Sequence, residues 1–466
     1  MIFHSPLFAV FLVVTLGLFW ALSARRRARE VLLLVASYAF YASWHPYYLG
    51  LIVFSTLLDH VCGRRIAASD DPGTRRRWLL LSLTGNIGVL AFFKCYDFFI
   101  ESSRVVLQAV GFDVPLETLG LVIPVGISFY TFQTLSYTLD IYRRQLAPAR
   151  SLLDFALFVA FFPQLVAGPI VRAVEFLPQL ELAPRFDRQR LHDGLWRMSL
   201  GLAKKVLLAD QLGYLLVDPV WAQPELYGTW PRVVALYAFT FQIYCDFSGY
   251  SDIAIGVARL FGFDLPENFH APLRARCVRE FWRRWHTTLS YWVRDYIYFP
   301  LGGSRGTPLR VSFNLMVTML LLGLWHGASV LWLLYGLVHG VAVAGERLAT
   351  RGRGPDLDSR GTKALAGWLV TFHFTVGMLV LVRAITVEAL GEFTGPVGPT
   401  VSVPVIGMWI LAAAAVTHFA PDRWGAACAR TWQRLPTLAV SALVGALAGL
   451  LALVMVGETP YIYFQF

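Results

Sequence analysis

Charge is scarce in this chain. Only 15% of its 466 residues are Asp, Glu, Lys or Arg, and 56% are hydrophobic, whereas soluble domains carry about 25% charged residues. Apolar runs long enough to cross about 30 Å of hydrocarbon recur along the sequence, and no stretch has the composition of a soluble domain. These features exclude a water-soluble globule and predict an all-α, polytopic membrane protein.

Cysteine and the motifs of soluble enzymes are also scarce or missing. The five cysteines are an odd number and widely separated, so no disulfide framework and no metal site is expected. We find no GxSxG nucleophile elbow, no Walker loop and no HExxH zinc motif. A catalytic site would therefore have to be built inside the membrane domain.

Basic residues gather in short clusters between apolar runs, and they account for the net charge of +10. This pattern is typical of cytoplasmic loops under the positive-inside rule, so we expect a lipid bilayer and no nucleic acid as partner. The clusters lie at residues 25–27, 64–77, 143–144, 274–284 and 351–360. The first apolar run precedes its arginines, which predicts a retained span with the N-terminus outside.

Hydropathy predicts roughly ten to twelve transmembrane or re-entrant helices. Between 153 and 263, Pro163, the Gly168-Pro169 pair and the charged residues Lys204, Lys205 and Asp210 interrupt apolar runs, so broken helices are expected there. The expected spans are 7–23, 31–43, 47–62, 78–99, 119–141, 232–263, 311–327, 328–346, 365–387, 402–419 and 436–456.

We expect a single membrane domain over residues 1–466, and it divides by sequence character. Its expected parts are N-terminal helices at 1–263, an embedded cytoplasmic-side segment at 264–310, a hairpin at 311–346 and C-terminal helices at 347–466.

His326 is the strongest candidate for a catalytic residue. It lies in Gly323-Leu-Trp-His-Gly327, about 15 residues into the predicted hairpin and so roughly 22 Å from its cytoplasmic end. An ionisable group at that depth is costly and suggests function, although a histidine bonded to a neighbouring carbonyl remains the alternative. His339, on the return limb, could face the same cavity.

Two further polar groups lie in apolar surroundings. His286 ends Glu280-Phe-Trp-Arg-Arg-Trp-His286, a segment that fits either an amphipathic surface helix or a buried hydrogen-bonded assembly. Asp246 and Asp252 would be costly facing lipid, and they fit either the capping of a broken helix or a site. A neutral histidine in a low-dielectric tunnel could take a proton from an alcohol as that alcohol attacks a thioester.

Seven motifs occur in order along most of the chain. Together they resemble the membrane-bound O-acyltransferase family, and within it the bacterial branch of alginate O-acetyltransferases and D-alanyl-lipoteichoic-acid transferases. The motifs are Pro124-Val-Gly-Ile-Ser-Phe-Tyr-Thr-Phe-Gln133, Phe162-Pro-Gln-Leu-Val-Ala-Gly-Pro-Ile170, Gly201-Leu-Ala-Lys-Lys-Val206, Asp246-Phe-Ser-Gly-Tyr-Ser-Asp252, Glu280-Phe-Trp-Arg-Arg-Trp-His286, Gly323-Leu-Trp-His-Gly327 and Tyr463-Phe-Gln-Phe466.

The resemblance implies an acyltransferase with His326 and His286 as catalytic residues and His339, Asp246 and Asp252 as accessory residues. It implies helices around a central tunnel, with no bound cofactor and an acyl thioester, acetyl-CoA or an acyl carrier, as cytoplasmic co-substrate. An acetyl group would then move outward for O-acetylation of an extracellular polysaccharide such as alginate. A periplasmic SGNH-like acetyltransferase and the polysaccharide acceptor are the implied partners.

Several alternatives remain open on the sequence. D-alanyl transfer to teichoic acid and peptidoglycan O-acetylation would use the same chemistry, whereas a transporter or a scaffold of an export complex would not. A transporter would favour inverted repeats, and none is detected. Only four of the 40 basic residues are lysine, which suggests a GC-rich bacterial genome and favours a multi-pass protein of a Gram-negative inner membrane.

Overall fold

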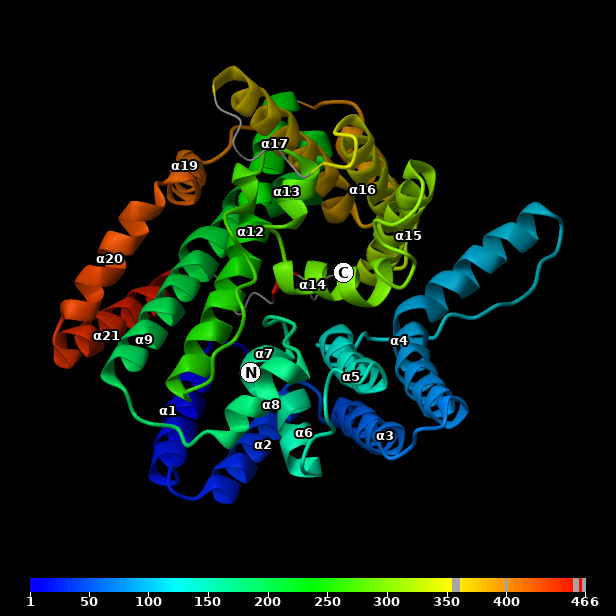
Figure 1. Cartoon of the computed structure of the whole chain (residues 1–466). Coiled ribbons are helices and arrows are strands. Elements are labelled where there is room, and N and C mark those ends of the chain that lie inside the picture. The colour runs from blue at the N-terminus through cyan, green and yellow to red at the C-terminus, as the bar shows by residue number, and fades with distance from the viewer. Residues whose placement is uncertain (354–360, 399–400, 456–460, 463–466) are drawn as a thin grey trace. The chain divides into compact units, whose positions relative to one another are not determined.

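The computed structural model describes residues 1–353, 361–398, 401–455 and 461–462. The terminal motif at 463–466 and part of the last basic cluster, at 354–360, lie outside the described residues. All regular structure in the described part of the chain is helical, which confirms the all-α part of the predicted fold class. Four helices are long and apolar enough to cross a membrane, and a fifth span results if the bent pair α19 and α20 counts as one (Figure 1).

The chain forms two compact units. The first unit comprises Ser5–Arg185 with Met1, and the second comprises Phe186–Phe466 with Ile2–His4. The helices of the first unit are α1 Pro6–Ala21, α2 Arg26–Ala42, α3 Leu49–Ala67, α4 Pro72–Ala109, α5 Ile127–Tyr142, α6 Leu152–Ala160, α7 Phe162–Leu165 and α8 Ala173–Glu181.

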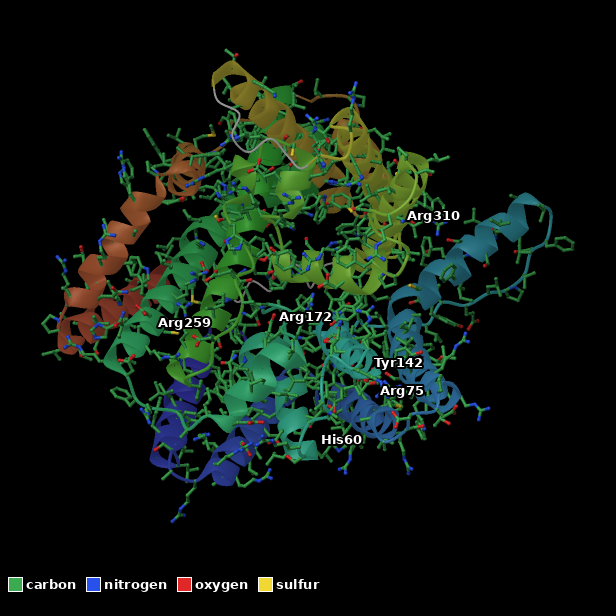
Figure 2. All side chains as sticks on the ribbon, viewed as in Figure 1. His60, Arg75, Tyr142, Arg172, Arg259 and Arg310 are labelled. Carbon is green, nitrogen blue, oxygen red and sulfur yellow. The ribbon has the colours of Figure 1, made fainter. Side chains whose placement is uncertain are left out.

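Buried polar groups join α3, α4 and α5 in the first unit. The carboxylate of Asp59 on α3 accepts hydrogen bonds from Ser82, from Asn86 at 2.8 Å and from Thr138 at 2.9 Å. Arg75 of α4 donates to the carbonyl oxygen of Tyr142 at 2.7 Å, and Figure 2 shows these two residues close together. Because lipid offers no hydrogen-bond partners, such internal pairing is what allows polar side chains to lie inside a helical bundle.

The second unit contains the longer series of helices. The 32-residue α12 is central among them. Its elements are α9 Arg188–Leu202, α10 Asp210–Leu212, α11 Asp218–Ala222, α12 Thr229–Leu260, α13 Val278–Trp282, α14 Thr287–Val293, α15 Pro308–His326, α16 Val330–Ala349, α17 Gly361–Ala384, α18 Val387–Thr394, α19 Val405–Phe419, α20 Asp422–Arg434 and α21 Thr437–Val454.

The backbones of α9 and α12 approach each other closely. A Cβ atom on Gly201 would lie only 2.4 Å from the carbonyl oxygen of Gly249, so only glycine fits at this crossing. Small residues that allow two helices to approach are typical of membrane bundles. This approach brings the cations that follow α9 against the polar middle of α12.

Most predicted spans correspond to helices, with informative differences. Within the span predicted at 119–141, the helix starts only at Ile127. A proline disfavours helical conformation in the residue before it, so a helix that begins before Pro124 cannot continue through it. The span predicted at 78–99 belongs to the longer α4, which continues to Ala109. Helical breaks occur near Pro163, as predicted.

The helix does not break at the charged residues Lys204, Lys205 and Asp210, contrary to the prediction. The chain stays helical there and widens into π-helical turns at Ala203–Ala209 and Gly213–Val217. A π turn reorients side chains without ending the helix and occurs frequently at functional sites. The span predicted at 232–263 corresponds to the continuous α12, so of the two readings left open for Asp246 and Asp252 the capping of a broken helix is ruled out.

Replacing Asp59 by Ala should destabilise the protein. The change leaves three buried donors without their acceptor, and each such loss costs about 1 to 3 kcal/mol. We expect a clear fall in the midpoint of thermal unfolding in detergent. Asp70→Ala is the control, because Asp70 is 93% exposed and pairs with Arg144 at the surface; equal midpoints for the two variants would contradict the assignment.

Candidate functional site

The hairpin of α15 and α16 positions His326. Pro308 and the capping side chain of Thr307 begin α15, and His326 is its last residue, roughly 27 Å along the helix axis. The two helices touch backbone to backbone, because a Cβ atom on Gly323 would lie 2.3 Å from the carbonyl oxygen of Trp332. Gly323, three residues before His326, therefore serves close packing within the hairpin.

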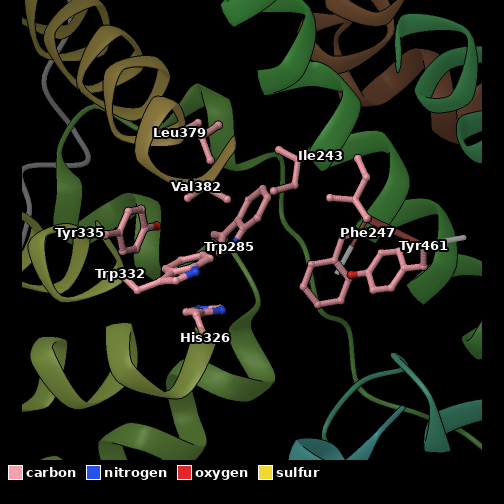
Figure 3. A pocket seen from close by; sticks show the side chains of 10 residues that line it. Ile243, Phe247, Trp285, His326, Trp332, Tyr335, Leu379, Val382 and Tyr461 are labelled. Atoms are coloured by element: carbon pink, nitrogen blue, oxygen red, sulfur yellow. The ribbon is translucent and has the colours of Figure 1, made fainter. Parts of the chain in front are cut away.

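A pocket opens beside the His326 ring (Figure 3). Its walls are largely apolar and aromatic, a composition typical of small-molecule sites. The lining residues come from α12, α15, α16, α17 and segments near α14 and the C-terminus, and they are Ile243, Phe247, Trp285, His326, Trp332, Tyr335, Leu379, Val382, Tyr461 and Ile462. His326 is thus the one sequence-predicted site residue that lines this pocket.

Two tryptophans fix the orientation of the His326 ring. The indole of Trp332 stacks on it with centroids 4.9 Å apart and planes at 15°. Trp325 meets it edge to face at 4.7 Å. A side chain held on two sides loses little further conformational freedom on reaction, which favours a positioned acid or base.

His286 lies in a buried hydrogen-bond network next to the pocket. Its Nδ1 donates to the side-chain oxygen of Asn268 at 2.9 Å, and Thr288 donates to the same oxygen at 3.0 Å. The imidazole contacts Phe247, a wall residue, with centroids 4.7 Å apart. Burial holds the pKa of His286 well below its ordinary value, so the ring is neutral near pH 7. Of the two alternatives for this segment, the structure shows the buried assembly.

His339 does not line the pocket but contacts one of its walls. Trp282 donates from Nε1 to Nδ1 of His339 at 3.2 Å. The ring of His339 lies 4.4 Å from that of Tyr335. His339 therefore does not face the cavity of His326, as it could have on the sequence, and contacts that pocket only indirectly, through Tyr335.

Asp246 and Asp252 bind cations that follow or belong to α9. Asp246 pairs with Lys205 at 2.7 Å, and Lys205 also pairs with Asp210 at 2.8 Å. Asp252 pairs with Arg197 at 2.6 Å and with Lys204 at 2.7 Å. Neither aspartate caps a break, because both lie on the continuous α12.

A second, polar pocket surrounds Asp252 and its two cation partners. Arg197, Lys204, Ser251, Asp252 and Asn268 line it together with apolar residues. Asn268 also holds His286, so one amide side chain connects the polar pocket with the network beside the His326 pocket.

Several of these residues were not singled out by the sequence. Trp332, Tyr335 and Trp285 lack a distinguishing signal, since aromatic residues are common in apolar helices. Lys205 did carry a signal, because a lysine inside an apolar run requires a counter-ion; pairing it with Asp246 by charge balance was possible. Among the described residues, no group of three or more His, Cys, Asp or Glu side chains is arranged to hold a metal ion.

Removing the Lys205 cation should destabilise the second unit. Lys205→Ala leaves the buried carboxylates of Asp246 and Asp210 without their partner, and breaking a buried pair costs about 3 to 5 kcal/mol. Thermal unfolding in detergent should show the loss, whereas Arg190→Ala, which removes an exposed pair with Asp264, should leave the midpoint unchanged. The prediction fails if Lys205→Ala unfolds at the wild-type temperature.

Comparison with known proteins gives this geometry a family. A sequence model of the membrane-bound O-acyltransferase family matches residues 144–382, just over half of the chain. The matched stretch includes His286, His326, all of the polar pocket and most of the His326 pocket.

Curated relatives agree with this match. A protein of Pseudomonas aeruginosa, described as a probable alginate O-acetylase, is 39% identical over 82% of this chain and 72% of its own length. A peptidoglycan O-acetyltransferase of Helicobacter pylori is 35% identical over 85% of this chain and 80% of its own length. A teichoic acid D-alanyltransferase of Streptococcus thermophilus is 30% identical over 53% of this chain and 63% of its own length. The chain that builds a histidine-lined pocket inside an apolar helical bundle therefore belongs to the membrane-bound O-acyltransferase family and is an O-acyltransferase.

Proposed function

We propose that this protein takes an acetyl group from a cytoplasmic thioester and moves it across the membrane for O-acetylation of an extracellular polysaccharide such as alginate. The observation that carries the proposal is the placement of His326, held between two indoles and facing a largely apolar pocket. The relatives' names support acetyl as the acyl group.

His326 acts as the general base of this reaction. Its neutral imidazole takes the proton of the acceptor hydroxyl as the hydroxyl oxygen attacks the carbonyl carbon of the thioester. The carbon–sulfur bond then breaks, and the thiolate leaves with the proton that the imidazole received. General acid–base catalysis of this kind contributes about 10²- to 10⁴-fold to the rate.

His286 is the second catalytic residue in the proposal. Its ring packs against Phe247, which walls the pocket, and Asn268 fixes its tautomer by accepting from Nδ1. Since an amide oxygen only accepts, Nε2 of His286 carries a lone pair that can receive a hydrogen bond. His339, Asp246 and Asp252 are accessory residues that hold the walls in place.

The proposal extends to topology and partners. Ten to twelve transmembrane or re-entrant helices surround a tunnel through a bacterial inner membrane, with the basic clusters on the cytoplasmic face. Acetyl-CoA or an acyl carrier is the donor, and no bound cofactor is required. A periplasmic SGNH-like acetyltransferase completes the transfer to the polysaccharide.

Peptidoglycan is the second candidate acceptor. The Helicobacter pylori relative that acts on peptidoglycan is nearly as similar as the alginate relative and is covered over more of its length. D-alanyl transfer to teichoic acid has weaker support, since that relative matches little more than half of this chain. Measuring O-acetyl groups on alginate and on peptidoglycan in cells that produce this protein would separate the two acetyl acceptors.

His326→Ala should abolish turnover. Purified protein in lipid vesicles should release free thiol from acetyl-CoA, and the variant should lose at least 100-fold of that rate because the general base is gone. His373→Ala is the matched control, since His373 lies on α17, is exposed and is bonded only to the carbonyl oxygen of Leu369. Normal turnover by a folded His326→Ala protein would refute the catalytic assignment.

A further inference from the structure

Tyr335 presents a polar group to the His326 pocket that the proposed chemistry has not used. The side chain is only 6% exposed and lines the pocket. Figure 3 shows its hydroxyl turned toward the pocket interior. No residue in the described part of the chain forms a hydrogen bond with this hydroxyl, because the recorded contacts of Tyr335 are all ring contacts.

The Tyr335 hydroxyl is open to the pocket. Buried tyrosines normally find a hydrogen-bond partner for the O–H group. Elsewhere in this protein Tyr41 donates to the carbonyl oxygen of Val125 at 3.0 Å, and Tyr298 lies 3.0 Å from the hydroxyl of Ser304. The cost of leaving the Tyr335 hydroxyl without a protein partner points to a partner that enters the pocket.

The ring that carries this hydroxyl is held in place. Trp332 meets it edge to face at 5.4 Å, and the same indole stacks on His326. The His339 ring also packs against the Tyr335 ring, with centroids 4.4 Å apart. Trp282 in turn holds His339 through the 3.2 Å hydrogen bond. Trp332 thus sets both His326 and Tyr335 relative to one pocket.

We propose that the Tyr335 hydroxyl donates a hydrogen bond to the carbonyl oxygen of the acyl group during transfer. This inference rests on the proposed acyl transfer. When the acceptor oxygen attacks the carbonyl carbon, the carbonyl electron pair moves onto its oxygen, and the Tyr335 O–H stabilises that negative charge. No proton leaves Tyr335, because the intermediate collapses, expels the thiolate and restores the carbonyl. Donors aimed at developing charge in a water-poor site are among the strongest catalytic devices.

Tyr461 is the other pocket-lining residue that carries a side-chain hydroxyl. The imidazole of His326 is occupied with the hydroxyl proton, and the second phenol, Tyr461, lies among Phe247 and Tyr250. Figure 3 shows Tyr461 beside Phe247 and away from Tyr335. His339 is then a positioning residue, which acts on the reaction by holding the Tyr335 ring.

The test compares Tyr335→Phe with Tyr237→Phe in full-length protein in phosphatidylethanolamine–phosphatidylglycerol vesicles, with acetyl-CoA as probe. Tyr335→Phe should lower kcat by roughly 100-fold, the lower end of the range for losing one oxyanion donor, with KM changed less than about 2-fold. Its thermal midpoint should stay unchanged, because the deleted oxygen bonds nothing in the described protein. Tyr237 lies on α12 outside the pocket and packs on Phe372, so Tyr237→Phe should keep the wild-type kcat.

A second comparison tests the role of His339. His339→Leu should lower kcat in the wild-type background but cause no further loss in the Tyr335→Phe background, since both changes remove one interaction. A merely structural role would lower kcat equally in both backgrounds and would overturn the positioning assignment.

The outcomes separate this inference from the proposed function. If His326→Ala is inactive while Tyr335→Phe retains the wild-type kcat, with or without a change in KM, the Tyr335 proposal is wrong and the acyl transfer stands. If His326→Ala turns over normally, the proposed function fails and the Tyr335 proposal fails with it.

Discussion

Asp246 occupies the middle of α12, where an unpaired carboxylate would be costly among apolar neighbours. Its Oδ1 pairs with Lys205 at 2.7 Å, and its Oδ2 accepts a hydrogen bond from the backbone nitrogen of Ile462 at 2.8 Å. The first interaction joins α12 to the π-helical turn after α9, and the second brings the end of the described chain against α12. Tyr461 and Ile462 thereby become walls of the pocket that contains His326. The shape of the pocket beside His326 therefore depends on this buried ion pair.

The same helix supports both pockets because of where its polar and aromatic residues fall. Ile243 and Phe247 face the pocket of His326, while Asp252 organises the polar pocket through Arg197 and Lys204. Asn268 links the two by lining the polar pocket and holding His286.

Composition and motif reasoning predicted much of this arrangement. The all-helical membrane class followed from low charge and long apolar runs, and His326 was identified because a glycine-flanked histidine lies deep in a predicted hairpin. The cost of burying Asp246 and Asp252 was also evident, but their cation partners depend on tertiary packing. The π-helical turns at Ala203–Ala209 were beyond prediction, because hydropathy detects an interruption and not the geometry that accommodates it. Tyr335 and Trp332 were missed because only the folded hairpin shows which aromatic side chains face the cavity.

The central claim is that acyl transfer takes place in the pocket beside His326. A structure of the full-length protein in lipid nanodiscs with a non-hydrolysable ketone analogue of acetyl-CoA would test it most directly. The account predicts density for the ketone carbon in that pocket, with room for an acceptor oxygen between it and the His326 ring at reacting distances of about 3 to 3.5 Å. Density for the ketone outside the pocket, with His326 facing only protein, would contradict it.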